Sequence, residues 1–465
     1  MKIIFQSILL SMISIFALGQ EFRMKVTFET APEKEVYLAH YYLGNIYADD
    51  TLKLDLNGTG IFRRDTLLQQ GLYKIFLDEN HHFDILLGAD QEFELVNKTF
   101  SKSNYEVEGA PETEEFIRYM DFLSRLKKEN AEIKKRLITA NEEEKTDLQN
   151  QLSSLNSKLI DYWKEIENKY PDTFLARFLM ANYVAELDES TLPPEILQND
   201  SLLLLEKFRY QHQHFWDHFD YTDERFLYTP LLKPKLETWF TRVLYQNYDS
   251  VKPYVFRFIE DTRPHKRIFQ FVTSWFLNSS INSNVIGMDA LFIDLARAYY
   301  LSGEAYWASE ESIEKIKENV LFLEHNLIGQ IAPDLTLESV DGEYYNLHQV
   351  ESKRTCVLIY EPNCSHCKEF VPKFYNQVYK KYKDKGLEVY AIYSMENKEE
   401  WTEFLAKYQL WDWINVWDKD HVSQFKILYD GRKTPGIFVL DENKKIISKK
   451  LSVDQLEKLM QYQLN

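Results

Sequence analysis

The sequence predicts a multi-domain protein in which a small antiparallel β domain and an all-α region with a helical hairpin precede a C-terminal α/β domain. Three observations support this prediction. The 465 residues exceed what one ordinary hydrophobic core accommodates. The hydrophobic pattern changes from short β-prone runs to helical spacing near residue 111. After residue 328, strand-like and helix-like segments alternate, which is typical of an α/β fold.

The N-terminal residues have the pattern of a secretory signal peptide. Lys2 supplies the positive charge, residues 3–18 are mainly apolar, and Ala17-Leu18-Gly19 ends the run with small residues. We therefore expect a signal peptide over residues 1–19 and a protein of the periplasm or cell envelope. An uncleaved membrane anchor is the alternative, although the run is short for a span of about 20 residues.

Residues 20–110 are expected to form the small β domain. Val36–Tyr41 and Phe83–Leu87 are short β-prone runs, and glycine-containing turns such as Asn57-Gly58 separate such segments. Strands joined by short turns pair antiparallel, so a sandwich-like antiparallel arrangement is predicted.

Residues 111–327 are expected to be helical, beginning with two long helices. Apolar residues recur at alternating spacings of four and three in two segments, which are separated by a break over residues 139–142. The first set is Tyr119, Leu123, Leu126, Asn130, Ile133 and Leu137, and the second is Leu148, Leu152, Leu155, Leu159, Tyr162 and Ile166. This spacing predicts an antiparallel helical hairpin, which Pro171 terminates.

Residues 328–465 are expected to form the α/β domain. A strand–turn–strand hairpin over residues 335–347 comes first. The remaining predicted elements, in order, are a strand over 355–360, a helix to about 385, a strand over 387–393, a helix over 398–408, strands over 436–440 and 445–448, and a helix over 452–462.

Cys364-Ser365-His366-Cys367 is the most informative motif of the chain. It follows the apolar run 355–360 and opens a predicted helix, so Cys364 is expected at a helix N-terminus, where the backbone dipole favours a thiolate. Such a thiolate attacks disulfides, and a second cysteine three residues later resolves the mixed disulfide. With only three cysteines in the chain, a scaffold stapled by disulfides is not expected.

The strand order, the cysteine pair and Thr434-Pro435 together resemble the thioredoxin superfamily over residues 328–465. Gly329-x-x-Ala332-Pro333-Asp334 and the leading hairpin resemble the TlpA/ResA-type thiol-disulfide oxidoreductases and the related AhpC/TSA group, and the multi-domain layout resembles exported proteins of the Bacteroidetes. The resemblance implies that Cys364 is the nucleophile and Cys367 the resolving cysteine. It also implies that Pro435 is a cis-proline, which leaves the Thr434 backbone free to pair with an extended substrate segment.

Two neighbouring residues are candidates for tuning this chemistry. His366, just before the resolving cysteine, is expected to stabilise the Cys364 thiolate and make the couple more oxidising, the alternative being a solvent-facing histidine of little effect. The position of thioredoxin's buried acid is Leu358 here, so Glu361 is a candidate for proton transfer, with an exposed loop carboxylate as the equal alternative. Pro372 matches the family's helix-kinking proline.

Other chemistries fit the sequence less well. A peroxiredoxin carries Thr where this chain has Glu361, and a zinc site on the cysteine pair needs further ligands, whereas Cys356 lies in an apolar strand. His214 and His218 would share a helical face, but two histidines do not make a metal site. We expect neither metal nor cofactor. The formal net charge of −18 argues against a nucleic-acid partner.

The sequence therefore predicts an exported thiol-disulfide oxidoreductase that acts on protein disulfides, more as a reductase than as an oxidase or isomerase. Its expected partners are disulfide-containing exported proteins and a membrane thiol-disulfide electron carrier. A rival interpretation is a binding or assembly protein of the cell envelope with a regulatory redox site, because most of the chain precedes the cysteine pair. Neither the oligomeric state nor the role of residues 20–327 follows from the sequence.

Overall fold

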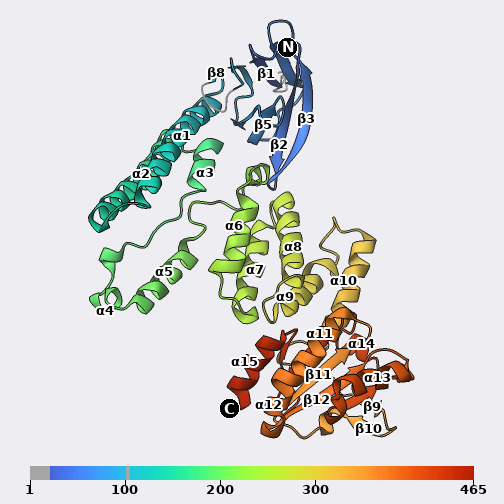
Figure 1. Cartoon of the computed structure of the whole chain (residues 1–465). Coiled ribbons are helices and arrows are strands. Elements are labelled where there is room, and N and C mark those ends of the chain that lie inside the picture. The colour runs from blue at the N-terminus through green and yellow to red at the C-terminus, as the bar shows by residue number, and fades with distance from the viewer. Residues whose placement is uncertain (1–20, 101–104, 465) are drawn as a thin grey trace, which may run out of the picture. The chain divides into compact units, whose positions relative to one another are not determined.

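The computed structural model describes residues 21–100 and 105–464 (Figure 1). The chain forms two compact units, and the division falls between Leu244 and Tyr245, within the helical region. The predicted signal peptide, residues 1–19, lies outside the described residues. None of the described helices combines the length and hydropathy needed to cross a bilayer.

Two four-stranded sheets among the described residues share one core at the start of the first unit. The strands are β1 (Phe22–Thr27), β2 (Glu35–Tyr42), β3 (Asn45–Lys53), β4 (Thr59–Arg64), β5 (Gly71–Phe76), β6 (His82–Leu87), β7 (Glu92–Val96) and β8 (Glu106–Glu108). The sheet orders are β4-β1-β7-β8 and β3-β2-β5-β6. Alternate residues such as Phe22, Met24 and Val26 of β1 are buried between the sheets.

The predicted antiparallel pairing holds for all but one of the strand pairs that the structure describes in this domain. β1 and β7 are parallel, with Met24 opposite Phe93. These two strands are far apart in the sequence, so no tight hairpin imposes an antiparallel direction on them. The antiparallel pairing was predicted from short turns between neighbouring strands, and no such turn joins β1 to β7.

The helical hairpin is present as predicted. Helix α1 (Pro111–Leu137) and helix α2 (Glu142–Lys169) bury Leu126, Ile133, Leu148 and Leu155 between them. Asn141 starts α2 with a capping box, because its side chain accepts the Glu144 N–H while the Glu144 carboxylate accepts the Asn141 N–H.

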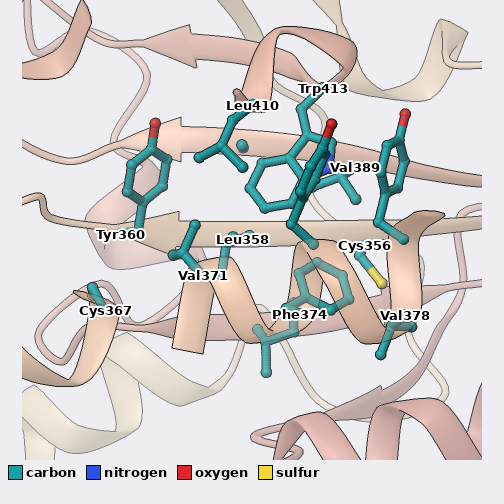
Figure 2. Close-up of a cluster of buried hydrophobic side chains, with 14 of the residues drawn as sticks. Cys356, Leu358, Tyr360, Cys367, Val371, Phe374, Val378, Val389, Leu410 and Trp413 are labelled. Carbon is teal, nitrogen blue, oxygen red and sulfur yellow. The ribbon is translucent and has the colours of Figure 1, made fainter. Parts of the chain in front are cut away.

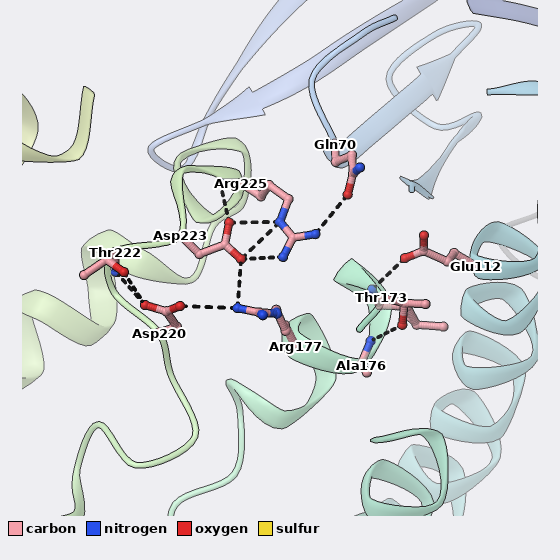
Figure 3. A network of polar contacts seen from close by, with 10 residues as sticks. Gln70, Glu112, Thr173, Ala176, Arg177, Asp220, Thr222, Asp223 and Arg225 are labelled. Carbon is pink, nitrogen blue, oxygen red and sulfur yellow. Dashed lines mark hydrogen bonds and ion pairs between the residues drawn. The ribbon is translucent and has the colours of Figure 1, made fainter. Parts of the chain in front are cut away.

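A polar network connects the β domain to the helices that follow the hairpin (Figure 3). The Arg225 guanidinium donates to the Asp223 carboxylate at 2.6 Å and to Gln70 Oε1 at 3.0 Å. Arg177 donates to Asp220 at 3.2 Å. The helices of this part are α3 (Phe174–Met180), α4 (Pro194–Leu197), α5 (Asp200–His214) and α6 (Leu232–Thr238).

The second unit begins with helices and ends with the α/β domain. Its first helices are α7 (Tyr248–Thr262), α8 (Lys266–Ile281), α9 (Met288–Leu295) and α10 (Glu310–Leu323). The strands that follow are β9 (Thr336–Ser339), β10 (Tyr344–Asn346), β11 (Arg354–Tyr360), β12 (Leu387–Tyr393), β13 (Ile414–Trp417), β14 (Gly436–Leu440) and β15 (Ile446–Lys449). The helices between and after them are α11 (Ser365–Phe374), α12 (Lys380–Tyr382), α13 (Lys398–Tyr408), α14 (Phe425–Leu428) and α15 (Val453–Leu464).

These strands form one mixed sheet with the order β10-β9-β13-β12-β11-β14-β15. β12 pairs parallel with β11 and β13, whereas β14 and β15 are antiparallel additions at the other side of β11. The predicted strands and helices are all present, and β12, α13 and β14 have the predicted bounds. The four-residue strand β13 has no pattern of its own and is not predicted from the sequence.

β11 is the central element of the site that follows. Residues 355–360 are all buried because both faces of the sheet are covered, which explains the unbroken apolar run in the sequence. Figure 2 shows the hydrophobic core on one face of this sheet. In it, Cys356, Leu358 and Tyr360 of β11 pack against side chains of α11 such as Val371 and Phe374.

Candidate active site

The end of β11 and the start of α11 place the two motif cysteines in different environments. Cys364 is the N-cap residue of α11, with an extended backbone (φ −70°, ψ 124°), and its side chain is half-buried. Cys367 lies in the first turn of α11 and is fully buried in the core. Pro372 lies further along α11, where its missing N–H leaves a gap in the helical hydrogen bonding.

The Cys364 thiol has a pKa below its ordinary value. Burial acts most strongly and in the opposite direction, but it is outweighed by hydrogen bonds from the Cys367 backbone, the Thr434 side chain, the Cys367 side chain and the His366 backbone. Exposed backbone N–H groups of a first helical turn stabilise a thiolate in this way. Of the two motif cysteines, Cys364 is therefore the one that more readily forms a thiolate.

The other two cysteines are poor nucleophiles. Burial raises the pKa of Cys367 to about 12, and the neighbouring Cys364 sulfur adds to the increase. Burial alone raises the pKa of Cys356 to about 12. All three are free thiols. The motif therefore places a partly exposed thiol of lowered pKa beside a fully buried thiol of raised pKa.

The Thr434–Pro435 peptide bond is cis and lies directly against the cysteines. The Cys364 thiol donates to the Thr434 carbonyl oxygen, with 3.4 Å between sulfur and oxygen. The residues sit just before β14, which pairs antiparallel with β11. The pairing of β11 with β14 thus brings positions 70 residues apart in the sequence to one site.

The two tuning candidates occupy different positions. Glu361 is partly buried, its backbone contacts the Cys367 sulfur, and its carboxylate accepts a hydrogen bond from Ser394 Oγ at 3.3 Å. The His366 side chain is exposed, and the group that it contributes at Cys364 is its backbone N–H. Leu358 is fully buried among apolar side chains and offers no proton acceptor.

Further support for this turn comes from residues at the end of β12 and on α13 that the sequence did not indicate. Ser394, directly after β12, holds Glu361 and also donates to the Tyr360 carbonyl at 3.3 Å. Trp401 of α13 donates from Nε1 to the Tyr360 hydroxyl at 2.7 Å and stacks on Tyr393, with ring centroids 5.2 Å apart. No motif marks these residues, because their roles follow from the strand order.

The prediction that His214 and His218 share a helical face is wrong. Helix α5 ends at His214, so His218 lies in the turn beyond it. His214 Nδ1 contacts the Asp217 carboxylate at 2.6 Å, and the His218 ring packs on Tyr183. Among residues 21–100 and 105–464, no cluster of three or more His, Cys, Asp or Glu side chains is suited to a metal ion.

The difference between the cysteines predicts selective alkylation. In the folded chain, iodoacetamide is expected to modify Cys364 alone at neutral pH. Because the pKa of Cys364 is lowered, its thiolate forms at a lower pH than that of a free cysteine. The pH at which the alkylation rate is half-maximal should therefore lie below about 8.5, the ordinary pKa of a cysteine thiol. Mass spectrometry of tryptic peptides over a pH series measures this. Equal labelling of Cys364 and Cys367 would contradict the assignment.

The C-terminal part of the chain, which contains the two motif cysteines, is similar to known proteins. The AhpC/TSA family model matches residues 328–449. A thiol-disulfide oxidoreductase ResA of Bacillus cereus (strain ZK / E33L) is 24% identical over 135 residues, which cover 29% of this chain and 76% of that protein. A ResA of Geobacillus kaustophilus is 25% identical over 134 residues, which cover 28% of this chain and 75% of that protein.

The chain is also similar to solved structures. A domain of a possible thiol-disulfide isomerase from Cytophaga hutchinsonii is 36% identical and covers 29% of this chain and 92% of its own, with a TM-score of 0.28. A thioredoxin-like protein from Bacteroides caccae is 19% identical and covers 60% of this chain and 98% of its own, with a TM-score of 0.47.

Proposed function

Because this chain is a thioredoxin-like thiol-disulfide oxidoreductase of the TlpA/ResA type, we propose that it reduces disulfides of exported proteins through Cys364 and Cys367. The observation that carries the proposal is the asymmetry of the pair. Cys364 is accessible and has a lowered pKa, whereas Cys367 is buried with a pKa of about 12. Such a pair distinguishes the sulfur that meets the substrate from the sulfur that releases it.

The reaction begins when the Cys364 thiolate attacks one sulfur of the substrate disulfide. A Cys364–substrate disulfide forms, and the other substrate sulfur leaves as a thiolate and takes up a proton. Cys367 then loses its proton and attacks Cys364 Sγ, which releases the second substrate thiol. Two electrons have moved to the substrate, and the protein is left with a Cys364–Cys367 disulfide. A dithiol of a membrane electron carrier would reduce that disulfide again.

Deprotonation of Cys367 needs a nearby base, since its pKa is about 12. Glu361 is the carboxylate that we assign to this step, because its own backbone contacts the Cys367 sulfur and Ser394 orients its side chain. Thr434 would supply the backbone groups for an extended substrate segment, and His366 would favour the thiolate form of Cys364 from the solvent side. Export to the periplasm or cell envelope belongs to the same proposal.

The direction of electron flow is tested by the reduction potential. The TlpA/ResA likeness favours reduction. We therefore expect a reduction potential near that of thioredoxin, about −270 mV, and reduction of insulin disulfides by the purified chain. A potential near about −120 mV, as in DsbA, would instead assign an oxidase. Equilibration with glutathione buffers gives the potential, and the Cys356→Ala variant should give the same value because Cys356 lies apart from the exchange.

A further inference from the structure

A cleft begins at the cis-proline and is closed on its far side by helices that precede the α/β domain. Its volume is about 720 Å³, which is the size of a typical ligand site. Pro435 and Phe370 line it on the side of the cysteines, and Asn282, Asn319 and Leu323 line it from α8, α10 and their ends. Thr434, which contacts Cys364, is the residue next to Pro435. The cleft therefore adjoins the segment that contacts the Cys364 sulfur.

Direct contacts hold α10 against the loop that carries the cis-proline. The Arg432 guanidinium donates to Asn319 Oδ1 at 2.9 Å and lies 4.2 Å from the centre of the Phe322 ring. The same guanidinium donates to the Asp430 carboxylate at 2.6 Å. These contacts join α10 to the segment just before Pro435, so the helix is a wall of the site.

A buried ion pair fixes the neighbouring part of this wall. Lys449 of β15 pairs with Asp289 of α9, and their side chains are only 4% and 11% exposed. The Lys449 ammonium also donates to the Asn326 carbonyl at 2.8 Å and to Asn326 Oδ1 at 2.9 Å. A buried charge pair with added hydrogen bonds is costly to break, so α9 is held firmly on the α/β domain.

The charges that remain in the cleft are positive. Both lining carboxylates are engaged, Asp289 with Lys449 and Asp430 with Arg432. Lys433 and Lys450 also line the cleft, are exposed, and make no ion pair with any described residue. The cleft thus combines apolar walls with two uncompensated ammonium groups in a chain whose net charge is −18.

We infer that this cleft binds an extended polypeptide segment that carries acidic side chains near the disulfide to be exchanged. Lys433 and Lys450 would pair with the carboxylates, and the apolar walls would take an adjacent apolar side chain. Asn282 and Leu323, which come from outside the family domain, would then determine which substrates bind. This inference rests on the proposed function for its substrate class, and it assigns a task to the helices before residue 328.

The test uses the full chain and two disulfide peptides that differ only in having Glu or Lys beside the cysteines. The Lys433→Glu/Lys450→Glu variant should reduce kcat/KM for the Glu peptide by about 3- to 20-fold and raise it for the Lys peptide. The rate with the neutral 2-hydroxyethyl disulfide is measured in parallel, and kcat/KM for each peptide is divided by it, so that a change in the Cys364 thiol itself cancels. The matched control is Lys398→Glu/Lys407→Glu on α13, whose lysines are exposed outside the cleft. Equal effects of both variants would overturn the inference.

A binding measurement separates this inference from the proposed function. Fluorescence anisotropy with the same peptides, in which serine replaces both cysteines, needs no redox chemistry. Asn282→Trp should weaken binding of the Glu peptide by about fivefold or more because it fills the cleft, whereas Asn284→Trp, an exposed neighbour outside it, should not. Absent reduction with intact selective binding would overturn the proposed function alone, and equal binding by all variants would overturn the cleft.

Discussion

Replacing Cys364 by serine is expected to abolish disulfide exchange, with a loss of at least about 1,000-fold in insulin reduction. The serine hydroxyl has no accessible anion at neutral pH, and Cys367 is buried with a pKa of about 12, so it cannot take over the attack. Cys367→Ser is expected to retain the attack and lose the release step. It should therefore accumulate mixed disulfides between Cys364 and exported proteins, which vanish on treatment with dithiothreitol.

The control for both variants is Cys356→Ala. Cys356 is fully buried in β11 and its sulfur lies in the apolar core, so the change should lower stability slightly and leave exchange intact. Non-reducing electrophoresis and mass spectrometry identify the trapped partners. If Cys367→Ser traps nothing while the native chain reduces insulin, the roles of Cys364 and Cys367 are assigned wrongly.

Trp401→Ala is expected to lower the stability of the α/β core by about 3–5 kcal/mol. Trp401 is completely buried and stacks on Tyr393 with an angle of 6° between the rings. It also donates a hydrogen bond to the Tyr360 hydroxyl. The substitution removes this bond, so the buried hydroxyl loses its donor. The matched control is Trp411→Ala. Trp411 is 54% exposed, so its loss should change stability by less than about 0.5 kcal/mol.

Alkylation of Cys356 reports on this core without interference from the rest of the chain. In a Cys364→Ser/Cys367→Ser background, Cys356 is the only thiol, and it lies in the same hydrophobic cluster as Trp401. The expected loss of stability corresponds to labelling that is faster by more than about 100-fold. Unchanged labelling after Trp401→Ala would show that the cluster does not depend on this side chain.

Much of the C-terminal domain could be predicted because its signals are local. The unbroken apolar run of β11 reflects burial on both sheet faces, and α13 starts at an asparagine cap followed by regular apolar spacing. The hairpin α1–α2 was equally clear from its heptad-like seam. In contrast, β13 has only four residues, and its assignment as a strand depends on pairing with β12 and β9. The spacing of the apolar residues also did not predict that α5 ends at His214.

The sequence by itself determined the strand–turn–helix that carries Cys364 and Cys367 and the proline that faces them, since motif spacing and hydrophobic period are properties of neighbouring residues. Tertiary structure decided how the two thiols differ. The pKa of Cys367 is raised because strands and helices from distant segments bury it, and Cys364 gains the Thr434 contact only through the pairing of β11 with β14. The same holds for the cleft, where Arg432 meets α10 across more than a hundred residues of chain. Burial and long-range pairing are created by folding, and for this reason no single segment encodes them.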